Sequence, residues 1–399
     1  MATTVTSHRG YFQRIGDSFR GLGFGLILFV AAFRLLFWNE GVAKRNADAL
    51  GEIGASVVSV DCDSVNPLNE GKVIHFRGRA EAPDCVLRDD CFGVEQTNVL
   101  ALVRNAQMYQ WEQKEQTETK TNLGGSEDTT TAYSYSKGWF SDLVSSDGFI
   151  ESEDPKTKEP HVNPPEWAVP PAKQYATGVK VGAFRIPDNR VPAIGKEVPA
   201  PLPAVTNALP AGAKAGLVRT DWGLYFSWGA TNMPASPKIG DEKLTLTMVR
   251  STDVSFIAVQ SGDTIVPYVA KDGVTTKFLQ SDGLRSPEEM VASAKKANTT
   301  FHFILRILGF FLMRFGLRVL VKPLGVIADV LPFLGSIVRF LTGAVLSVVS
   351  AVLTLATIGI AWIVVRPAIG ISLLAAAAAL VVLCVAMKKK ASPAGGTAP

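Results

Sequence analysis

The stretch GLGFGLILFVAAFRLLFW, residues Gly21–Trp38, decides the class of protein to which this chain belongs. At about 1.5 Å of helix per residue it has about the length that crosses a hydrocarbon core of roughly 30 Å. Asn39 and Glu40 follow it without the small-x-small pattern of a signal-peptidase site, so we interpret it as a retained anchor rather than a cleaved signal. Arg34, one turn from its far end, can extend its side chain to the headgroups.

Three further apolar segments lie in the C-terminal part of the chain, at residues 301–321, 337–365 and 368–387. The first contains His302, Arg306, Arg314 and Arg318, and each charge at the bilayer centre is costly. This composition favours a tilted or partly interfacial helix, with a functional intramembrane site as the alternative. Arg366 and Pro367 separate the last two segments, so the sequence predicts a helical hairpin with its turn at the membrane surface.

Small residues recur at helical spacing in two of these segments. Gly21 and Gly25 form a GxxxG pair in the first, and Gly343, Ser347 and Ala351 recur every fourth residue in the third. Such faces allow close helix packing, within one chain or between two copies in a homo-oligomer. The sequence therefore predicts helix-packing roles for these five residues.

Basic residues outside the apolar segments predict the orientation of the chain. His8, Arg9, Arg14 and Arg20 precede the first segment, and three lysines, residues 388–390, follow the last, which favours both termini in the cytosol. The predicted divisions are a cytosolic N-terminus at 1–20, helices at 21–38, 301–321, 337–365 and 368–387, a lumenal or periplasmic domain at 39–300, a cytosolic or re-entrant loop flanked by prolines at 322–336, and a cytosolic tail at 388–399.

The insert between the first two helices shows a period of two. Short runs rich in β-branched or aromatic residues alternate with Gly, Pro, Asn and Asp; they lie at 57–60, 72–79, 99–111, 176–184, 243–249 and 254–259. Polar residues with two glycines predict a mobile loop at 117–131. Ser286, Pro287 and Glu289 predict a helix start that leads toward the membrane. The predicted fold is membrane α-helical, with four transmembrane helices and a large β-rich α+β non-cytosolic domain.

Composition and cysteine count exclude several classes of protein. The 40 basic and 36 acidic groups leave a net charge of +4, too small to indicate a nucleic-acid binder. Cys62, Cys85 and Cys91 lie in the insert and Cys384 in the last helix, too few for a disulfide scaffold or a zinc framework. A disulfide between Cys85 and Cys91 is possible in an oxidising compartment.

No catalytic signature is present in the sequence. His8, His75, His161 and His302 are scattered without metal-ligand spacing, and no nucleophile elbow, phosphate loop or dinucleotide motif occurs. We therefore expect no metal and no cofactor, and an enzymatic role is left open but not favoured. Asp329, between two prolines, could pair with a nearby basic residue or serve a catalytic or ion-conducting site. That candidate intramembrane polar site comprises Asp329, His302, Arg306, Arg314 and Arg366.

Several motifs resemble the transmembrane protein 43 family, also called LUMA. They are WNEG at residues 38–41, MYQWE at 108–112, PLGVIADVLPFLG at 323–335, and IAW at 360–362 followed by Arg366, Pro367 and Gly370. The resemblance extends over nearly the whole chain, with a looser match at residues 114–210.

The resemblance implies a four-span protein of the endoplasmic reticulum and inner nuclear membrane in eukaryotes, or of the inner membrane in bacteria. It also implies a scaffold that organises membrane protein complexes, self-associates, and binds nuclear-envelope proteins such as emerin and lamins, with membrane lipids around its helices. It assigns no catalytic residue. The alternatives are an intramembrane lipid-processing enzyme and a channel subunit, each using a polar site around Asp329.

Overall fold

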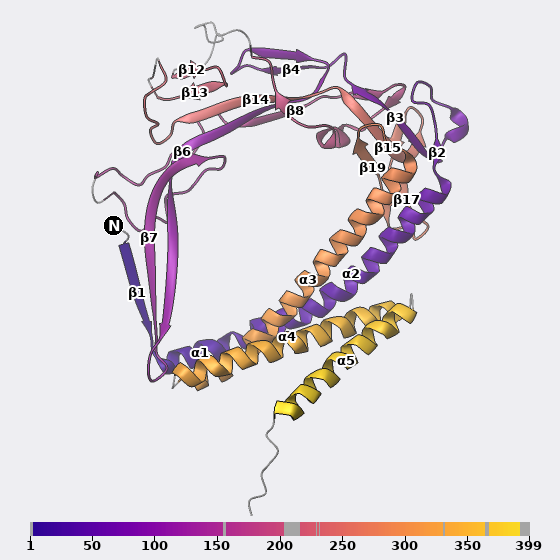
Figure 1. Ribbon diagram of the computed structural model, residues 1–399. Coiled ribbons are helices and arrows are strands. Elements are labelled where there is room, and N and C mark those ends of the chain that lie inside the picture. Colours follow the sequence, from indigo (N-terminus) through magenta and orange to yellow (C-terminus); the bar gives the residue numbers. More distant parts are fainter. Residues whose placement is uncertain are drawn as a thin grey trace, which may run out of the picture. The chain divides into compact units, whose positions relative to one another are not determined.

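The computed structural model describes residues 3–154, 157–202, 216–228, 230, 232–329, 332–363 and 367–391, which form two compact units (Figure 1). The first unit comprises Met1–Thr4, Ala49–Gln116 and Ala132–Ala294, and is rich in β-structure. The second comprises Val5–Asp48, Thr117–Thr131 and Lys295–Pro399, and is mainly helical. The predicted combination of apolar helices and a large β-rich domain is confirmed.

The larger sheet has eight strands in the order β1-β7-β6-β14-β13-β12, with β8 paired to β6 and β11 paired to β14. The strands are β1 (Thr3–Arg9), β6 (Val99–Thr121), β7 (Glu127–Phe140), β8 (Ala172–Tyr175), β11 (Val198–Pro199), β12 (Leu217–Arg219), β13 (Leu224–Phe226) and β14 (Glu242–Arg250). β6 and β14 are antiparallel with Leu102 opposite Met248. β6 and β7 run side by side as a long hairpin, visible in Figure 1.

The second sheet has seven strands in the order β19-β15-β16-β10-β9-β3-β2, and β15 also pairs with β3. They are β2 (Val58–Ser59), β3 (Val73–Glu81), β9 (Lys180–Val181), β10 (Phe184–Arg185), β15 (Thr252–Ser261), β16 (Thr264–Val266) and β19 (Leu279–Asp282). Two small hairpins, β4–β5 (Val86–Asp89 and Val94–Thr97) and β17–β18 (Tyr268–Val269 and Thr276–Lys277), and the 3-10 turns η1 (Pro67–Asn69) and η2 (Asp188–Ala193) complete the described part of this unit.

Aromatic side chains fill the core of the β-rich unit. Phe76 stacks on Phe184 and on Phe256, with ring centroids 4.5 and 5.6 Å apart, and all three are buried. A second apolar cluster gathers Phe92 and Phe226 with aliphatic residues of β6 and β14. The alternation of buried and less buried residues along β14 follows the period of two that the sequence predicts.

The helical unit contains α1 (Tyr11–Arg20), α2 (Leu22–Ser56), α3 (Pro287–Ala328), α4 (Pro332–Ile363) and α5 (Pro367–Ala391), of which α2 and α3 continue into the β-rich unit. Leu36 and Met313 are fully buried and pack with Ile358, so α2, α3 and α4 share an apolar core. α4 and α5 run side by side (Figure 1). Their connection at residues 364–366, including Arg366, lies outside the described residues.

Two described helical segments have the length and composition of a membrane span, Tyr11–Ser56 and Gly343–Ile363, while Pro367–Leu383 is a shorter apolar helix. The prediction of four spans is therefore matched in part. α3 carries Arg306, Arg314, Arg318 and Lys322 and is not among the candidate spans. Charged side chains at that density raise the cost of burial in lipid.

The structure differs from the predicted loop at residues 322–336. α3 continues through Pro323 to Ala328 and α4 begins at Pro332, so helix covers most of this stretch. Proline removes one backbone donor, and neighbouring groups in a membrane helix commonly compensate for that loss. The sequence predicts that the third helix begins at Ile337, which is five residues after its observed start at Pro332.

The structure also differs at the predicted mobile loop of residues 117–131. β6 and β7 extend through it as paired strands, and the hydroxyl groups of Thr117 and Thr131 lie 3.1 Å apart across the pair. Gly124 and Gly125 adopt positive φ in the turn. Polar composition indicated a loop, but β-branched threonines at alternate positions stabilise strands.

The predicted helix start before the second apolar segment is confirmed. α3 begins at Pro287, and the Glu289 backbone N–H donates to Ser286 Oγ at 3.2 Å. The Ser286 N–H donates to the Glu289 carboxylate, also at 3.2 Å. These reciprocal bonds form a capping box, which satisfies two backbone donors at the helix start.

Candidate functional site

The WNEG motif lies within α2 and contributes a buried carboxylate. The side chain of Glu40 is only 2 % exposed and forms a bidentate ion pair with Arg306 of α3, with both N–O distances 2.7 Å. Trp362 of α4 donates its indole N–H to the same carboxylate at 2.5 Å. A buried carboxylate is stabilised when charged and neutral donors of this kind surround it.

Asn39, next to Glu40, extends this group of residues to His302. Asn39 Oδ1 lies 2.6 Å from His302 Nδ1, and Asn39 Nδ2 donates to the His302 carbonyl at 3.2 Å. We call Asn39, Glu40, His302, Arg306 and Trp362 the Glu40 cluster. A cavity of about 300 Å³ is lined by its His302, Arg306 and Trp362 side chains. The cluster joins three helices through polar groups that are mostly buried.

A second polar group surrounds Asp329, whose side chain is 1 % exposed near the end of α3. Arg14 of α1 donates to Asp329 Oδ2 at 2.7 Å and to the Gly125 carbonyl at 2.5 Å, and its Nε lies 3.3 Å from Glu127. We call Arg14, Gly125, Glu127 and Asp329 the Asp329 cluster. A Cβ atom at Gly125 would lie 2.5 Å from the Tyr11 ring, so only glycine fits this turn.

A cavity of about 710 Å³ adjoins the Asp329 cluster within the helical unit. Its lining includes Arg14, Asp329, Arg314, Arg318 and Lys322. Arg314 donates from Nε to the Ser347 hydroxyl of α4 at 2.8 Å. This cavity is larger than the one beside the Glu40 cluster, and its walls are partly basic and partly apolar.

The predicted intramembrane polar site is thus divided between the two clusters. His302 and Arg306 belong to the Glu40 cluster, whereas Asp329 and Arg314 line the larger cavity, and Arg366 lies outside the described residues. Asp329 pairs with a basic residue that is distant in sequence, Arg14 of α1. Sequence reasoning missed Glu40, Asn39, Trp362 and Arg14 as site residues, although the WNEG and IAW motifs contain three of them.

The predicted helix-packing residues have different surroundings. A Cβ at Gly25 would lie 2.9 Å from Val319 Cγ1, and Gly21 lies beside the same valine, so this pair faces α3. Gly343 has no described atom within 4 Å of its Cβ position, and Ala351 is half-buried. Ser347 accepts the Arg314 hydrogen bond.

The possible disulfide between Cys85 and Cys91 is not formed, because Cys85 is a free thiol. Cys85 packs against both apolar clusters of the β-rich unit and Cys91 against the second. Each side chain therefore behaves as a small apolar group in its own packing environment.

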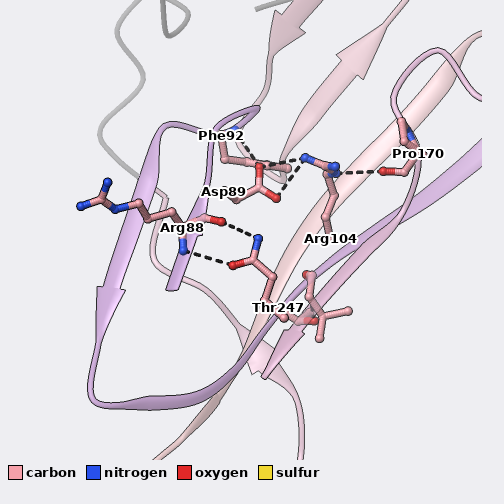
Figure 2. A network of polar contacts seen from close by, with 8 residues as sticks. Arg88, Asp89, Phe92, Arg104, Pro170 and Thr247 are labelled. Atoms are coloured by element: carbon pink, nitrogen blue, oxygen red, sulfur yellow. Dashed lines mark hydrogen bonds and ion pairs between the residues drawn. The ribbon is translucent and has the colours of Figure 1, made fainter. Parts of the chain in front are cut away.

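The β-rich unit contains a polar network of its own. Figure 2 shows Arg104 between the carboxylate of Asp89 and the carbonyl of Pro170, with N–O distances of 3.1 and 3.0 Å. The Phe92 N–H also donates to Asp89, and Gln174 bonds both backbone groups of Arg88. The Asp89 carboxylate is buried and accepts hydrogen bonds from both Arg104 and Phe92, so this network connects the β4–β5 hairpin to β6 and β8.

Among the described residues, Asp61, Cys62 and Asp63 are the one group whose potential metal-binding atoms lie within 4.8 Å of one another. Burial and the neighbouring Asp63 carboxylate raise the pKa of the Cys62 thiol above its usual value. The thiolate is the form that binds metals, so this shift opposes binding at neutral pH.

The two described helical segments with the length and composition of a membrane span are consistent with an integral membrane protein. The family model described as Transmembrane protein 43 matches residues 108–367, and the chain belongs to this family. The rat protein named Transmembrane protein 43 is 30% identical over 369 residues, covering 90% of this chain and 88% of its own length. The human protein of that name is 29% identical over 374 residues, with 91% and 89% covered.

A third relative extends the similarity to insects. The Transmembrane protein 43 homolog of Drosophila melanogaster is 29% identical over 373 residues, with 89% of this chain and 91% of the relative covered. No solved structure matches this chain.

Proposed function

We propose that this protein is a multi-pass scaffold that organises membrane protein complexes. The observation that carries the proposal is that Glu40 receives hydrogen bonds from α3 and α4 while it belongs to α2. These contacts hold three helices together and favour a rigid helical unit that presents surfaces to other proteins. The buried charges of Glu40 and Arg306 bind each other between helices and are not available to a substrate.

The proposed setting is the endoplasmic reticulum and nuclear envelope of a eukaryotic cell, or the inner membrane of a bacterium. Other membrane or nuclear-envelope proteins are the proposed partners, and self-association into a homo-oligomer is part of the proposal. Family membership supports a membrane location.

The proposal retains α3 and α5 as membrane-associated helices beside the two candidate spans. α3 exposes Phe303, Ile307, Phe311 and Phe315, which recur every fourth residue on one side of the helix. Exposed aromatic and aliphatic side chains at this spacing suit contact with lipid. The apolar length of α5 supports the same assignment.

A lipid-processing enzyme or a channel subunit is the second candidate function. The specific observation in its favour is that Asp329 lines a cavity of about 710 Å³. Against it, the Asp329 carboxylate is already paired with Arg14 at 2.7 Å.

Crosslinking and mass spectrometry of the full-length protein, purified in detergent beside its Asp329→Asn variant, tests these functions. A scaffold retains the same protein partners in both forms. If a chemically converted lipid or a small molecule, rather than an unmodified phospholipid, accumulates or disappears in the variant, the enzyme or channel function replaces the scaffold.

A second experiment tests self-association through α4. Leucine substitutions at Gly343 and Ala351 should disrupt the oligomer, because bulky side chains on a face of small residues prevent close helix approach. Ser347, the third residue of this face, stays unchanged because it accepts a hydrogen bond from Arg314 within the chain. Phenylalanine substitutions at Val345 and Val349, which are exposed on a different face of α4, serve as the matched control. An unchanged oligomer in all variants would exclude this face from assembly.

A further inference from the structure

The cavity beside the Asp329 cluster carries an excess of positive charge. Four basic side chains line it, Arg14, Arg314, Arg318 and Lys322, and two acidic ones, Glu127 and Asp329. Both acidic side chains contact Arg14. Three cations of α3 therefore remain without a carboxylate partner among the residues that the structure describes.

These three cations lie on one face of α3, because Arg314, Arg318 and Lys322 are spaced four residues apart. Like charges at this spacing repel each other and destabilise a helix. Arg314 is half-buried and bonds the neutral Ser347 hydroxyl, while neither Arg318 nor Lys322 has a described hydrogen-bond or ion-pair partner. An anion in the cavity would relieve this repulsion.

The remaining walls indicate what kind of anion fits. Val321, Val326 and Leu346 contribute apolar surface, and the Ser347 and Thr119 hydroxyls contribute polar surface. An arginine guanidinium matches phosphate geometry with two parallel hydrogen bonds, and basic pockets between membrane helices recognise lipid headgroups. A small soluble anion would leave the apolar walls without a contact.

We propose that this cavity binds the phosphate of an anionic phospholipid, with Arg314, Arg318 and Lys322 around the headgroup and the apolar walls against the acyl chains. A phospholipid headgroup and a free phosphate ion present the same phosphate group to these side chains, so the test must distinguish the two. The site is independent of the proposed scaffold role, since lipid binding and partner capture are measured separately.

The test uses the full-length protein in mild detergent, incubated with phosphatidylglycerol and phosphatidylcholine of identical acyl chains in equal amounts. Native mass spectrometry measures the ratio of the two lipids bound. We expect wild type to prefer phosphatidylglycerol, and Arg318→Gln with Lys322→Gln to reduce that preference roughly fivefold for each charge removed. Arg34→Gln removes an exposed cation from α2 and should leave the ratio unchanged.

Two further samples make the outcome decisive. The charge-preserving Arg318→Lys and Lys322→Arg double variant should retain the preference, which separates lost charge from misfolding. Inorganic phosphate added as competitor should not displace the lipid, and displacement would identify a soluble phosphate compound as the occupant instead. Equal binding of the two lipids by wild type, or an unchanged ratio in the Gln variants, would overturn the proposal.

Discussion

Glu40 is the residue whose removal we expect to destabilise the helical unit most directly. Glu40→Ala leaves Arg306 without its carboxylate partner, and the loss of one partner of a buried ion pair costs about 3–5 kcal/mol. The matched control is Asp48→Ala on the same helix, which breaks an exposed pair with Lys44 and should cost at most about 1 kcal/mol. Thermal unfolding in detergent measures both; equal losses would contradict a buried role for Glu40.

His75 provides a test of pH dependence in the β-rich unit. It is buried, its Nδ1 lies 3.1 Å from Ser59 Oγ, and its Nε2 lies 3.0 Å from the Arg285 carbonyl. Burial lowers the pKa of His75 below its usual 6.5 and the nearby Arg77 charge adds to the effect, while the hydrogen bond to the Arg285 carbonyl and the Glu288 charge oppose it. A neutral imidazole can accept from Ser59 and donate to Arg285 at the same time.

The sign of the effect follows from proton binding. As pH falls below 6.5, the unfolded chain protonates His75 before the folded protein does, so the free energy of unfolding decreases. The decrease ends below the folded pKa, where both states are protonated. Unfolding temperatures measured from neutral pH to about pH 5 should fall less in His75→Gln than in wild type. Parallel profiles for the two proteins would show that His75 titrates alike in both states.

At the scale of elements, the contact between α2 and α3 depends on two glycines that face each other. A Cβ at Gly25 would lie 3.2 Å from the Gly316 carbonyl oxygen as well as 2.9 Å from Val319. Gly25→Ala should therefore destabilise the helical unit by about 1–3 kcal/mol through overpacking. Gly23→Ala, with no described atom within 4 Å, should be neutral or stabilise by up to about 1 kcal/mol. Thermal unfolding of both variants checks this, and equal effects would argue against the close approach.

Elements with a strong local pattern could be predicted from the sequence. The strands β3, β14 and β15 lie where short β-branched and aromatic runs predict strands, β14 alternates with a period of two, and α3 starts at the predicted serine cap. The sequence predicts a loop for the hairpin end at residues 117–131, because its polar composition is typical of loops even though threonines alternate along it. Its stability comes from cross-strand pairs such as Thr119 and Thr129, whose hydroxyls lie 3.3 Å apart, and single-segment patterns do not reveal such pairs.

At the scale of the whole molecule, the candidate site depends on contacts between distant parts of the chain. Arg14 and Asp329 are 315 residues apart in sequence, and Glu40 and Trp362 are 322 apart. The sequence singled out Asp329, His302 and Arg306 because charges in apolar segments are costly. It could not assign their partners, since periodicity and composition describe one segment at a time.

The N-terminal strand β1 contacts residues of β7 that the predicted orientation places on the opposite side of the membrane. Thr6 Oγ1 lies 3.2 Å from Thr130 Oγ1, and His8 Nδ1 lies 2.6 Å from Asp128. The sequence predicts residues 1–20 in the cytosol and residues 39–300 on the other side, with one crossing between them. Polar strands cannot cross lipid as an open hairpin, because their backbone groups would lack partners. The contacts therefore require Thr6 and Thr130 to lie on the same side of the bilayer.

A disulfide test decides between this contact and the predicted orientation. We expect the Thr6→Cys and Thr130→Cys double variant to crosslink under mild oxidation in intact membranes, with the mobility shift lost on reduction. Thr6→Cys with Thr119→Cys is the matched control, because β7 lies between β1 and β6 and separates these positions by about 9–10 Å, too far for a disulfide. Variants with a single introduced cysteine, at Thr6, Thr119 or Thr130, show any crosslink that an introduced cysteine forms with a native one. If the first pair does not crosslink, and the N-terminus and the hairpin are accessible from opposite sides of the membrane, the predicted single crossing at residues 21–38 is restored. If the pair does crosslink, α2 must lie along the membrane interface or return to the side where it began.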